Sequence, residues 1–160
     1  SVENLNGHKP AGVLNGGKYS PYEGGTRLPF LLRWPAQVKG GRKSAALVSQ
    51  IDLISSLATL TGQTLRPEAA PDSFDVLPAL LGDSPNGRQT LIEQAQRLAV
   101  RKGNWKLITA NNPKQKTELY DLGADLAETK DLADAKPEVV TELQAILQNA
   151  RKAGRTRNSA

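Results

Sequence analysis

The feature that most constrains the fold is a short apolar run bounded by prolines. It covers residues 28–34, with the sequence Leu-Pro-Phe-Leu-Leu-Arg-Trp, and Pro35 closes it. A run of this length and composition favours a β-strand buried on both faces, as in a parallel sheet. Pro29 cannot donate a hydrogen bond to a neighbouring strand, so we expect it at the start of this strand.

Composition excludes several classes of protein. The 160 residues suffice for one domain, or for one domain and a piece of another. Apolar residues make up 38% and aromatic residues 4%, which is lean for a core that must form alone. No run of about 18 apolar residues exists, which excludes a transmembrane helix. The absence of cysteine excludes disulfides, thiolate metal sites and cysteine nucleophiles.

The chain contains no methionine and begins in a polar loop, so we expect it to be a piece of a longer protein. Its net charge is +5, and the one dense basic stretch is the tail formed by Arg151, Lys152, Arg155 and Arg157. Nucleic-acid binding is therefore one hypothesis. No aromatic residues are interleaved with these basic ones, which favours a frayed basic tail instead.

The first half of the chain is predicted to be a loop, a strand and a helix. Residues 1–27 are rich in Gly, Asn and Pro, which is typical of an ordered loop. Residues 49–60 are predicted to be a deeply buried helix, because Ser49 and Asp52 form a capping box and apolar residues share one face. Gly62 is a plausible helix end. A proline-rich connector with one helical turn at residues 76–81 follows.

The second half is predicted to be a small antiparallel sheet and a helix. Weak strand signals cover residues 90–93 and 118–122, and residues 98–101 and 105–108 flank a turn typical of a β-hairpin. Residues 137–152 are predicted to be a helix, because Pro137 suits its first turn and one apolar stripe runs along it.

Spacing alone indicates little catalytic chemistry. One histidine and no G-x-S-x-G motif argue against a complete hydrolytic triad. The carboxylates between Asp121 and Glu128 are interpreted as a solvated strand-to-loop junction and not as a metal site. Lys18 follows two glycines and could hold an oxyanion, although a structural turn is the favoured alternative. Glu23 and Arg27 are expected to form an ion pair that braces the loop.

Five segments in order resemble the sulfatase family. The first carries Gly-Lys, four residues, Glu-Gly-Gly-x-Arg-x-Pro, an apolar strand and Trp-Pro over residues 17–35. The others are similar to family motifs at residues 48–53, 77–82, 99–108 with 118–122, and 131–133, where Asp131 replaces the usual Asn. The similarity covers nearly the whole chain.

The resemblance implies the C-terminal part of an alkaline-phosphatase-like α/β fold. Residues 1–87 would end the large α/β domain, and residues 88–160 would form a small antiparallel sheet and helix subdomain. It also implies a sulfuric ester hydrolase in which Lys18 holds the substrate sulfate and stabilises the transition state. His8 would line the substrate pocket, although a loop histidine without a catalytic duty is an equal alternative.

The family's formylglycine nucleophile and its divalent cation, usually calcium, have no matching motif here. The resemblance therefore places both upstream of Ser1 and implies that this chain alone is inactive. Expected partners are a sulfate-ester substrate and the upstream part of the same protein or another copy of the chain, with no membrane partner. Family members are commonly exported, so we expect a periplasmic or secreted protein. A non-catalytic anion-binding or structural module is the alternative.

Overall fold

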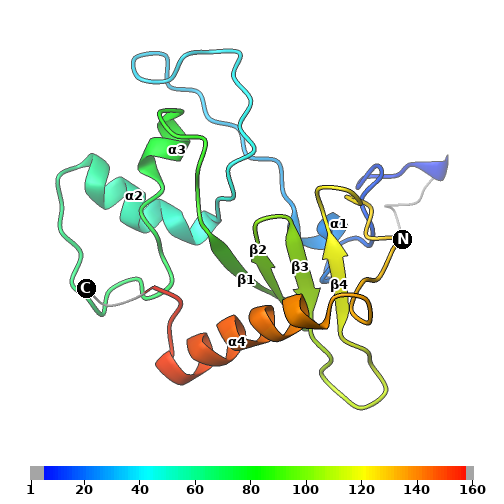
Figure 1. Cartoon of the computed structure of the whole chain (residues 1–160). Coiled ribbons are helices and arrows are strands. Elements are labelled where there is room, and N and C mark those ends of the chain that lie inside the picture. The colour runs from blue at the N-terminus through cyan, green and yellow to red at the C-terminus, as the bar shows by residue number, and fades with distance from the viewer. Residues whose placement is uncertain (1–5, 158–160) are drawn as a thin grey trace. The chain divides into compact units, whose positions relative to one another are not determined.

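The computed structural model describes residues 6–157, which form two compact units (Figure 1). Unit 1 combines the chain up to Pro29 with Ile92–Gln148, and unit 2 combines Phe30–Leu91 with the chain from Asn149 onward. The predicted boundary between residues 87 and 88 concerns the domains of the longer protein, and it stays a prediction.

Unit 1 is built around a four-stranded sheet with the strands in sequence order. The strands are β1 (Thr90–Ala95), β2 (Arg97–Lys102), β3 (Trp105–Ile108) and β4 (Glu118–Asp121). The pairs β2–β3 and β3–β4 are antiparallel. The predicted hairpin is confirmed. Lys102 pairs with Trp105, so the turn consists of Gly103 and Asn104 alone. Gly103 makes this turn with a φ of +56°, in the left-handed region that glycine enters easily.

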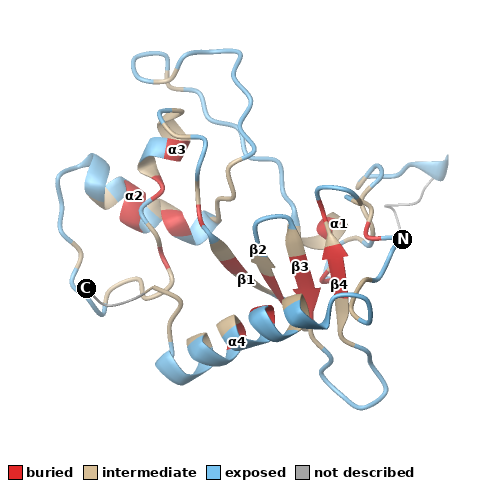
Figure 2. Ribbon diagram, viewed as in Figure 1, coloured by how far each residue is buried: buried red, intermediate tan, exposed pale blue. Residues whose placement is uncertain are grey.

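Buried residues gather in the strands of the sheet (Figure 2), and they form one cluster on each face. On one face, Leu143 and Leu147 of helix α4 (Pro137–Ala153) pack against Val100, Leu107 and Leu119. Successive strand residues point to opposite faces, so Lys106 and Ile108 lie on the other face. That second face carries a smaller cluster of residues from the strands and from the turn after β4, against which Tyr22 packs: Ala99, Ile108, Tyr120 and Leu122.

Unit 2 contains short helices: η2 (Gln50–Asp52), α2 (Leu53–Leu60) and α3 (Leu77–Leu81). The predicted start at Ser49 is confirmed, because its backbone N–H donates to Asp52 Oδ2 over 2.9 Å. The predicted end at Gly62 is also confirmed, with a φ of +68°. The helical turn expected near residues 76–81 is α3, which ends at Gly82 in the left-handed region.

Many of the buried residues of unit 2 are polar. Asp52 and Arg88 form an ion pair of 2.8 Å, and both side chains are almost completely buried. Asp52 Oδ1 also accepts from the backbone N–H of Phe74 over 2.9 Å, while the Arg88 guanidinium lies 4.4 Å from the centre of the Phe74 ring. A single buried ion pair thus joins the start of the helix to two later segments of the unit.

Two expectations about apolar burial are wrong for the described chain. Residues 28–34 form no strand, and Leu31 is 92% exposed. The apolar side of α2 is also exposed, with Ile54 at 55% and Leu57 at 52%, whereas Ser55 and Ser56 are buried. A strand needs a neighbour for its backbone groups, and within the described residues the backbone of residues 28–33 forms no hydrogen bond.

The basic tail is docked and not frayed as far as Arg157. The backbone N–H of Arg157 donates to the carbonyl of Pro71 over 3.0 Å, and its guanidinium donates to the carbonyl of Ala69 over 2.6 Å. Thr156 donates from both its backbone and its hydroxyl to Asp72. The carbonyl groups of an irregular segment attract these donors, which sequence spacing could not indicate. Along the helices that the structure describes, none is both long and apolar enough to cross a bilayer.

We expect backbone amides in the two kinds of segment to exchange hydrogen at different rates. Val100 and Leu107 face each other in the ladder and should be strongly protected, whereas the amides of residues 30–33 should exchange rapidly. Hydrogen-exchange mass spectrometry on the 160-residue chain measures both segments in one sample. Equal protection in a sample shown to be monomeric would contradict this expectation.

Candidate functional site

The loop that carries Lys18 is folded back on itself. We define this Lys18 loop as residues 15–27; it ends in the short helix α1 (Glu23–Thr26). Gly17 and Ser20 close its tip, since Gly17 N–H donates to Ser20 Oγ over 3.1 Å and Ser20 N–H donates to Gly17 O over 2.9 Å. The backbone N–H of Gly24 donates to Asn15 O over 2.7 Å, which ties the tip to the helix.

Two glycines of the loop are required by close backbone contact. A Cβ on Gly24 would lie 2.5 Å from the carbonyl oxygen of Asn15. A Cβ on Gly25 would meet the carbonyl oxygen of Ser20 well inside 3.0 Å, which no real Cβ tolerates. The two glycines of the Glu-Gly-Gly sequence therefore allow α1 to pack directly against the backbone at the tip of the Lys18 loop.

Lys18 is exposed at that tip. Its ammonium lies 4.9 Å from the centre of the Tyr19 ring, and within residues 6–157 it forms no ion pair. Tyr19 has a φ of +71°, a left-handed conformation that costs about 1–3 kcal/mol for a non-glycine residue. An ammonium held on a strained, tightly packed loop can bind an anion from solvent.

His8 is also exposed, in an irregular segment before the Lys18 loop. Within the described part of the chain, no hydrogen bond or ion pair joins His8 to Lys18 or to any other residue. The structure thus shows no direct polar contact between the two predicted site residues, and a substrate contact by His8 stays a prediction.

Beneath the Lys18 loop lies a buried group of charged side chains, which we call the Lys106 cluster. Its members are Lys106, Glu23, Glu93, Glu128 and Arg101. The Lys106 ammonium lies 2.9 Å from Glu23, 3.2 Å from Glu128 and 3.7 Å from Glu93. Arg101 lies 3.7 Å from Glu23. The expected Glu23–Arg27 ion pair is confirmed at 3.1 Å, at the exposed edge of this cluster.

The three carboxylates of the cluster do not have the same proton affinity. Burial raises the pKa of Glu23, but Lys106, Arg101 and Arg27 outweigh it, so the pKa of Glu23 lies below its ordinary value. For Glu93 and Glu128, burial outweighs the attraction of Lys106 and raises the pKa of each. Glu23 is therefore the carboxylate most firmly held as an anion.

The cluster does not provide a cation site of its own. An ammonium already occupies the point on which Glu23, Glu93 and Glu128 converge. Across the residues that the structure describes, no group of three or more His, Cys, Asp or Glu side chains could hold a metal ion. The family resemblance places the calcium ligands upstream of Ser1, so a calcium site stays a prediction for the longer protein.

A second set of polar side chains anchors the residue next to Glu23. The hydroxyls of Tyr22 and Tyr120 donate to Glu118 Oε2 over 2.8 and 2.7 Å, and Arg97 pairs with the other oxygen. The two rings meet edge to face with their centres 6.3 Å apart. Burial and the bond to Glu118 raise the pKa of Tyr120, so both tyrosines stay protonated donors.

Sequence reasoning missed most of the Lys106 cluster. Glu128 is 3% exposed, so the interpretation of residues 121–128 as a solvated junction is wrong at this position, because the loop after β4 folds back onto Glu23. Lys106 carried one signal, since strand alternation puts it on the same face as Ile108. Nothing in the spacing showed that its partners would come from positions 23 and 128.

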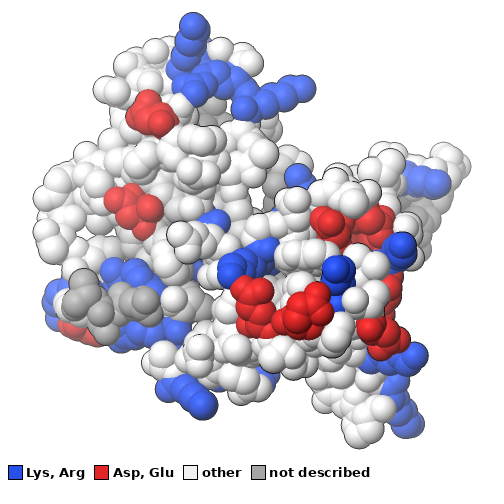
Figure 3. All heavy atoms as spheres, in the orientation of Figure 1, with Lys and Arg blue, Asp and Glu red and all other residues white. Residues whose placement is uncertain are grey.

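Charged residues of both signs lie next to one another over the sheet on the face drawn in Figure 3, and form no basic stripe there.

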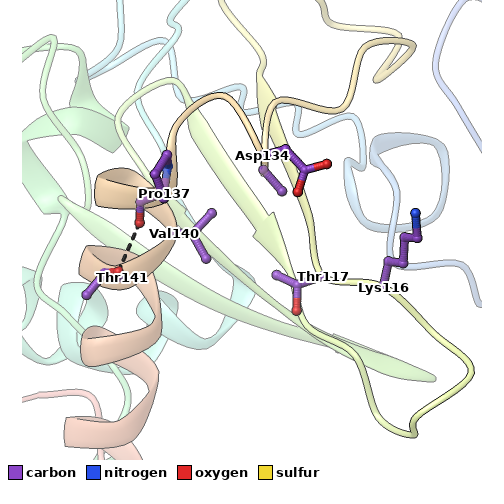
Figure 4. A pocket seen from close by; sticks show the side chains of 7 residues that line it. Lys116, Thr117, Asp134, Pro137, Val140 and Thr141 are labelled. Carbon is purple, nitrogen blue, oxygen red and sulfur yellow. Dashed lines mark hydrogen bonds between the residues drawn. The ribbon is translucent and has the colours of Figure 1, made fainter.

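A cavity of about 420 Å³ lies elsewhere in unit 1 (Figure 4). It is lined by residues before β4 and at the start of α4: Lys116, Thr117, Ala133, Asp134, Pro137, Val140 and Thr141. Neither Lys18 nor His8 lines it, so it is separate from the candidate site.

Comparison with protein families identifies the class to which this fold and loop belong. Residues 17–153 match the family model described as N-sulphoglucosamine sulphohydrolase, C-terminal, and the chain belongs to this sulfatase family. The match begins at Gly17, directly before Lys18, and ends with the last residue of α4.

Individual relatives agree with this assignment. The chain is 43% identical to an N-acetylgalactosamine-6-O-sulfatase of Bacteroides thetaiotaomicron, over 94% of this chain and 32% of that protein. It is 33% identical to human arylsulfatase A, over 85% of this chain and 32% of that protein. The chain thus spans about a third of the length of the curated relatives it matches.

Solved structures confirm the fold. A protein from a study of glycosaminoglycan metabolism by Bacteroides thetaiotaomicron has a TM-score of 0.86 and 43% identity, with 94% of this chain and 34% of that one covered. A sulfatase from Pseudoalteromonas sp. has a TM-score of 0.68 at 19% identity, with 90% and 34% covered, and shows the fold alone. The structure is the C-terminal part of a sulfatase fold, as the sequence predicted.

The close packing of Gly25 leads to a stability prediction. Gly25→Ala should lower the free energy of unfolding by about 1–3 kcal/mol, because the added methyl group must displace the backbone at Ser20. Gly17→Ala is the matched control, since a Cβ there meets nothing within 4 Å. Urea denaturation of both variants tests this, and equal stability of the two would show that the loop yields freely.

Proposed function

We propose that this chain is the C-terminal part of a hydrolase of sulfate esters, and that Lys18 binds the sulfuryl group of the substrate. The observation that carries the proposal is that the Lys18 ammonium is exposed on a tightly packed loop. The family match begins in this loop, at Gly17. The loop has a fixed shape because of the contacts of Glu23, Gly24 and Gly25. Within the described residues the Lys18 ammonium has no ion-pair partner, so it can bind an anion.

The chemistry of Lys18 follows from its charge. The S–O bond of a sulfate ester breaks with negative charge on the sulfuryl and leaving oxygens. A fixed ammonium beside these oxygens stabilises the transition state more than the ground state when that charge grows. Lysine does this as a point charge with three donors, without the bidentate geometry that arginine would impose.

The other groups of the proposed reaction lie outside this chain. A formylglycine nucleophile would attack sulfur, and a divalent cation, calcium in the first instance, would balance charge at the sulfate when bound. Both are proposed for the upstream part of the same protein. We further propose that His8 contacts the substrate and that the protein is periplasmic or secreted.

A sulfated sugar is the first substrate to test. The relative with 43% identity is named for action on a 6-O-sulfated N-acetylgalactosamine, whereas the aryl-sulfatase relative has 33% identity. Aryl sulfates remain useful as chromogenic probes, because the sulfuryl contact proposed for Lys18 is the same in both substrate classes.

Removal of the Lys18 ammonium should slow the reaction of the full-length protein. Lys18→Ala should lower kcat/KM by roughly 100-fold or more, the scale of losing one oxyanion donor. Steady-state kinetics with a 6-O-sulfated sugar and with an aryl sulfate measure the effect. The control is Lys130→Ala, which removes an exposed positive charge from the same unit. It should leave kcat/KM within about threefold of wild type, because substitutions of exposed residues usually have small effects.

A folded Lys18→Ala variant that keeps kcat/KM within about threefold of wild type would reduce Lys18 to a turn residue. A full-length protein that binds sulfate through Lys18 but hydrolyses neither substrate would favour the non-catalytic, anion-binding alternative.

The 160-residue chain alone should have no sulfatase turnover. The proposed nucleophile and cation ligands are absent from it, so the Lys18 ammonium has no reaction to assist. The purified chain is assayed with an aryl sulfate and calcium, next to the full-length protein. Turnover above that of buffer, purifying together with the chain, would contradict this expectation.

A further inference from the structure

The Lys18 loop is attached to the sheet through two consecutive residues. Glu23 reaches Lys106 on β3 over 2.9 Å, and Tyr22 reaches Glu118 on β4 over 2.8 Å. These contacts join positions 83 and 96 residues apart in sequence. The sheet therefore holds the loop at Glu23 by a buried ion pair and at Tyr22 by a partly buried hydrogen bond.

Lys106 is the centre of the first attachment. Its side chain is fully buried, and besides the three carboxylates it lies 3.4 Å from the Thr26 hydroxyl of α1. Glu128, which also pairs with Lys106, accepts a 2.7 Å hydrogen bond from the backbone N–H of Glu23. The ammonium thus fixes residue 23 through its side chain directly and through its backbone by way of Glu128.

The position of residue 23 passes to the tip of the loop through backbone contacts. Gly24, the next residue, donates to Asn15 O, and the Asn15 side chain donates to Glu128 O. Gly25 packs against the carbonyl oxygens of Gly17 and Ser20, which flank Lys18 and Tyr19. A shift of α1 therefore shifts the backbone that carries Lys18.

We propose that Lys106 is a positioning residue for Lys18: its buried ammonium holds Glu23 and Glu128 so that the Lys18 loop presents its own ammonium to the substrate anion. The inference rests on the sulfate-binding role proposed for Lys18. Lys106 itself is sealed from solvent and touches no substrate, so it acts only through the loop. A displacement of about 1 Å at a reacting group can lower a rate by 100-fold, which makes such support measurable.

A purely structural role would have a different signature. Loss of a buried cation destabilises any fold in which its carboxylates are left unpaired. Unit 2 offers a matched case, because the Arg88 side chain is equally buried and pairs with Asp52. The hydrogen bonds of its guanidinium go to Asp52, Asp72 and Thr90 and not to the Lys18 loop. Arg88→Met therefore controls for general destabilisation.

The test is a double-mutant cycle in the full-length protein at a temperature where circular dichroism shows every variant folded. Lys106→Met, Lys18→Ala and the double variant are compared by kcat/KM on an aryl sulfate. Lys106→Met should lower kcat/KM by at least about tenfold in wild type but by less than about threefold in the Lys18→Ala background, because the group it positions is then gone. Arg88→Met should have the same factor in both backgrounds.

Equal factors for Lys106→Met in the two backgrounds, or no effect in wild type, would overturn the inference. If the proposed role of Lys18 is itself wrong, the Lys18→Ala variant alone will have an unchanged kcat/KM, and this result is distinct from the failure of the inference. If Lys106→Met does not fold, Glu128→Gln decides, since it weakens the same attachment and keeps the ammonium paired with Glu23. It should show the same dependence on Lys18 with a smaller factor, and an additive result would again overturn the inference.

Discussion

The ion pair between Lys106 and Glu23 is the interaction on which the arrangement of unit 1 depends. It connects a strand of the sheet to a loop that has no regular structure beyond one helical turn. A buried ion pair is not a strong source of stability, because desolvation offsets most of its attraction. It is, however, specific: a carboxylate that must lie against one ammonium leaves the loop few other positions. The lean apolar composition makes this specificity more important, and the Asp52–Arg88 pair has the same part in unit 2.

The elements that could be predicted from the sequence are those whose signals are local. The hairpin turn at Gly103, the cap at Ser49 and the apolar stripe of α4 depend on neighbours within a few residues, and all are present. The strand expected at residues 28–34 has no such local basis. A strand exists only beside another strand, and in the described chain that segment has none. The apolar composition of the segment indicated burial, but burial also requires neighbouring strands or helices to cover it.

The candidate site divides in the same way. Lys18 was identifiable from its glycine-rich context and from the family resemblance, and the Glu23–Arg27 pair from its four-residue spacing. Lys106 and Glu128 were not, since their partners lie far away in the sequence and a lysine or glutamate is ordinarily a surface residue. Sequence patterns thus located the group proposed to meet the substrate and missed the groups beneath it. The missed groups lack a periodicity or motif of their own.

The wide separation of the Lys106 cluster along the chain has a consequence during synthesis. Glu23 leaves the ribosome 83 residues before Lys106, and translation at about 5–20 residues per second makes this delay roughly 4–17 s. Throughout that interval Lys106 and Glu118 have not been made, so Glu23 and Tyr22 lack these two strand partners, and the whole of residues 30–89 emerges before the first strand of the sheet. The local contacts of the loop, between Gly17 and Ser20 and between Gly24 and Asn15, can form early, whereas its attachment to the sheet waits until β3 and β4 have both been made.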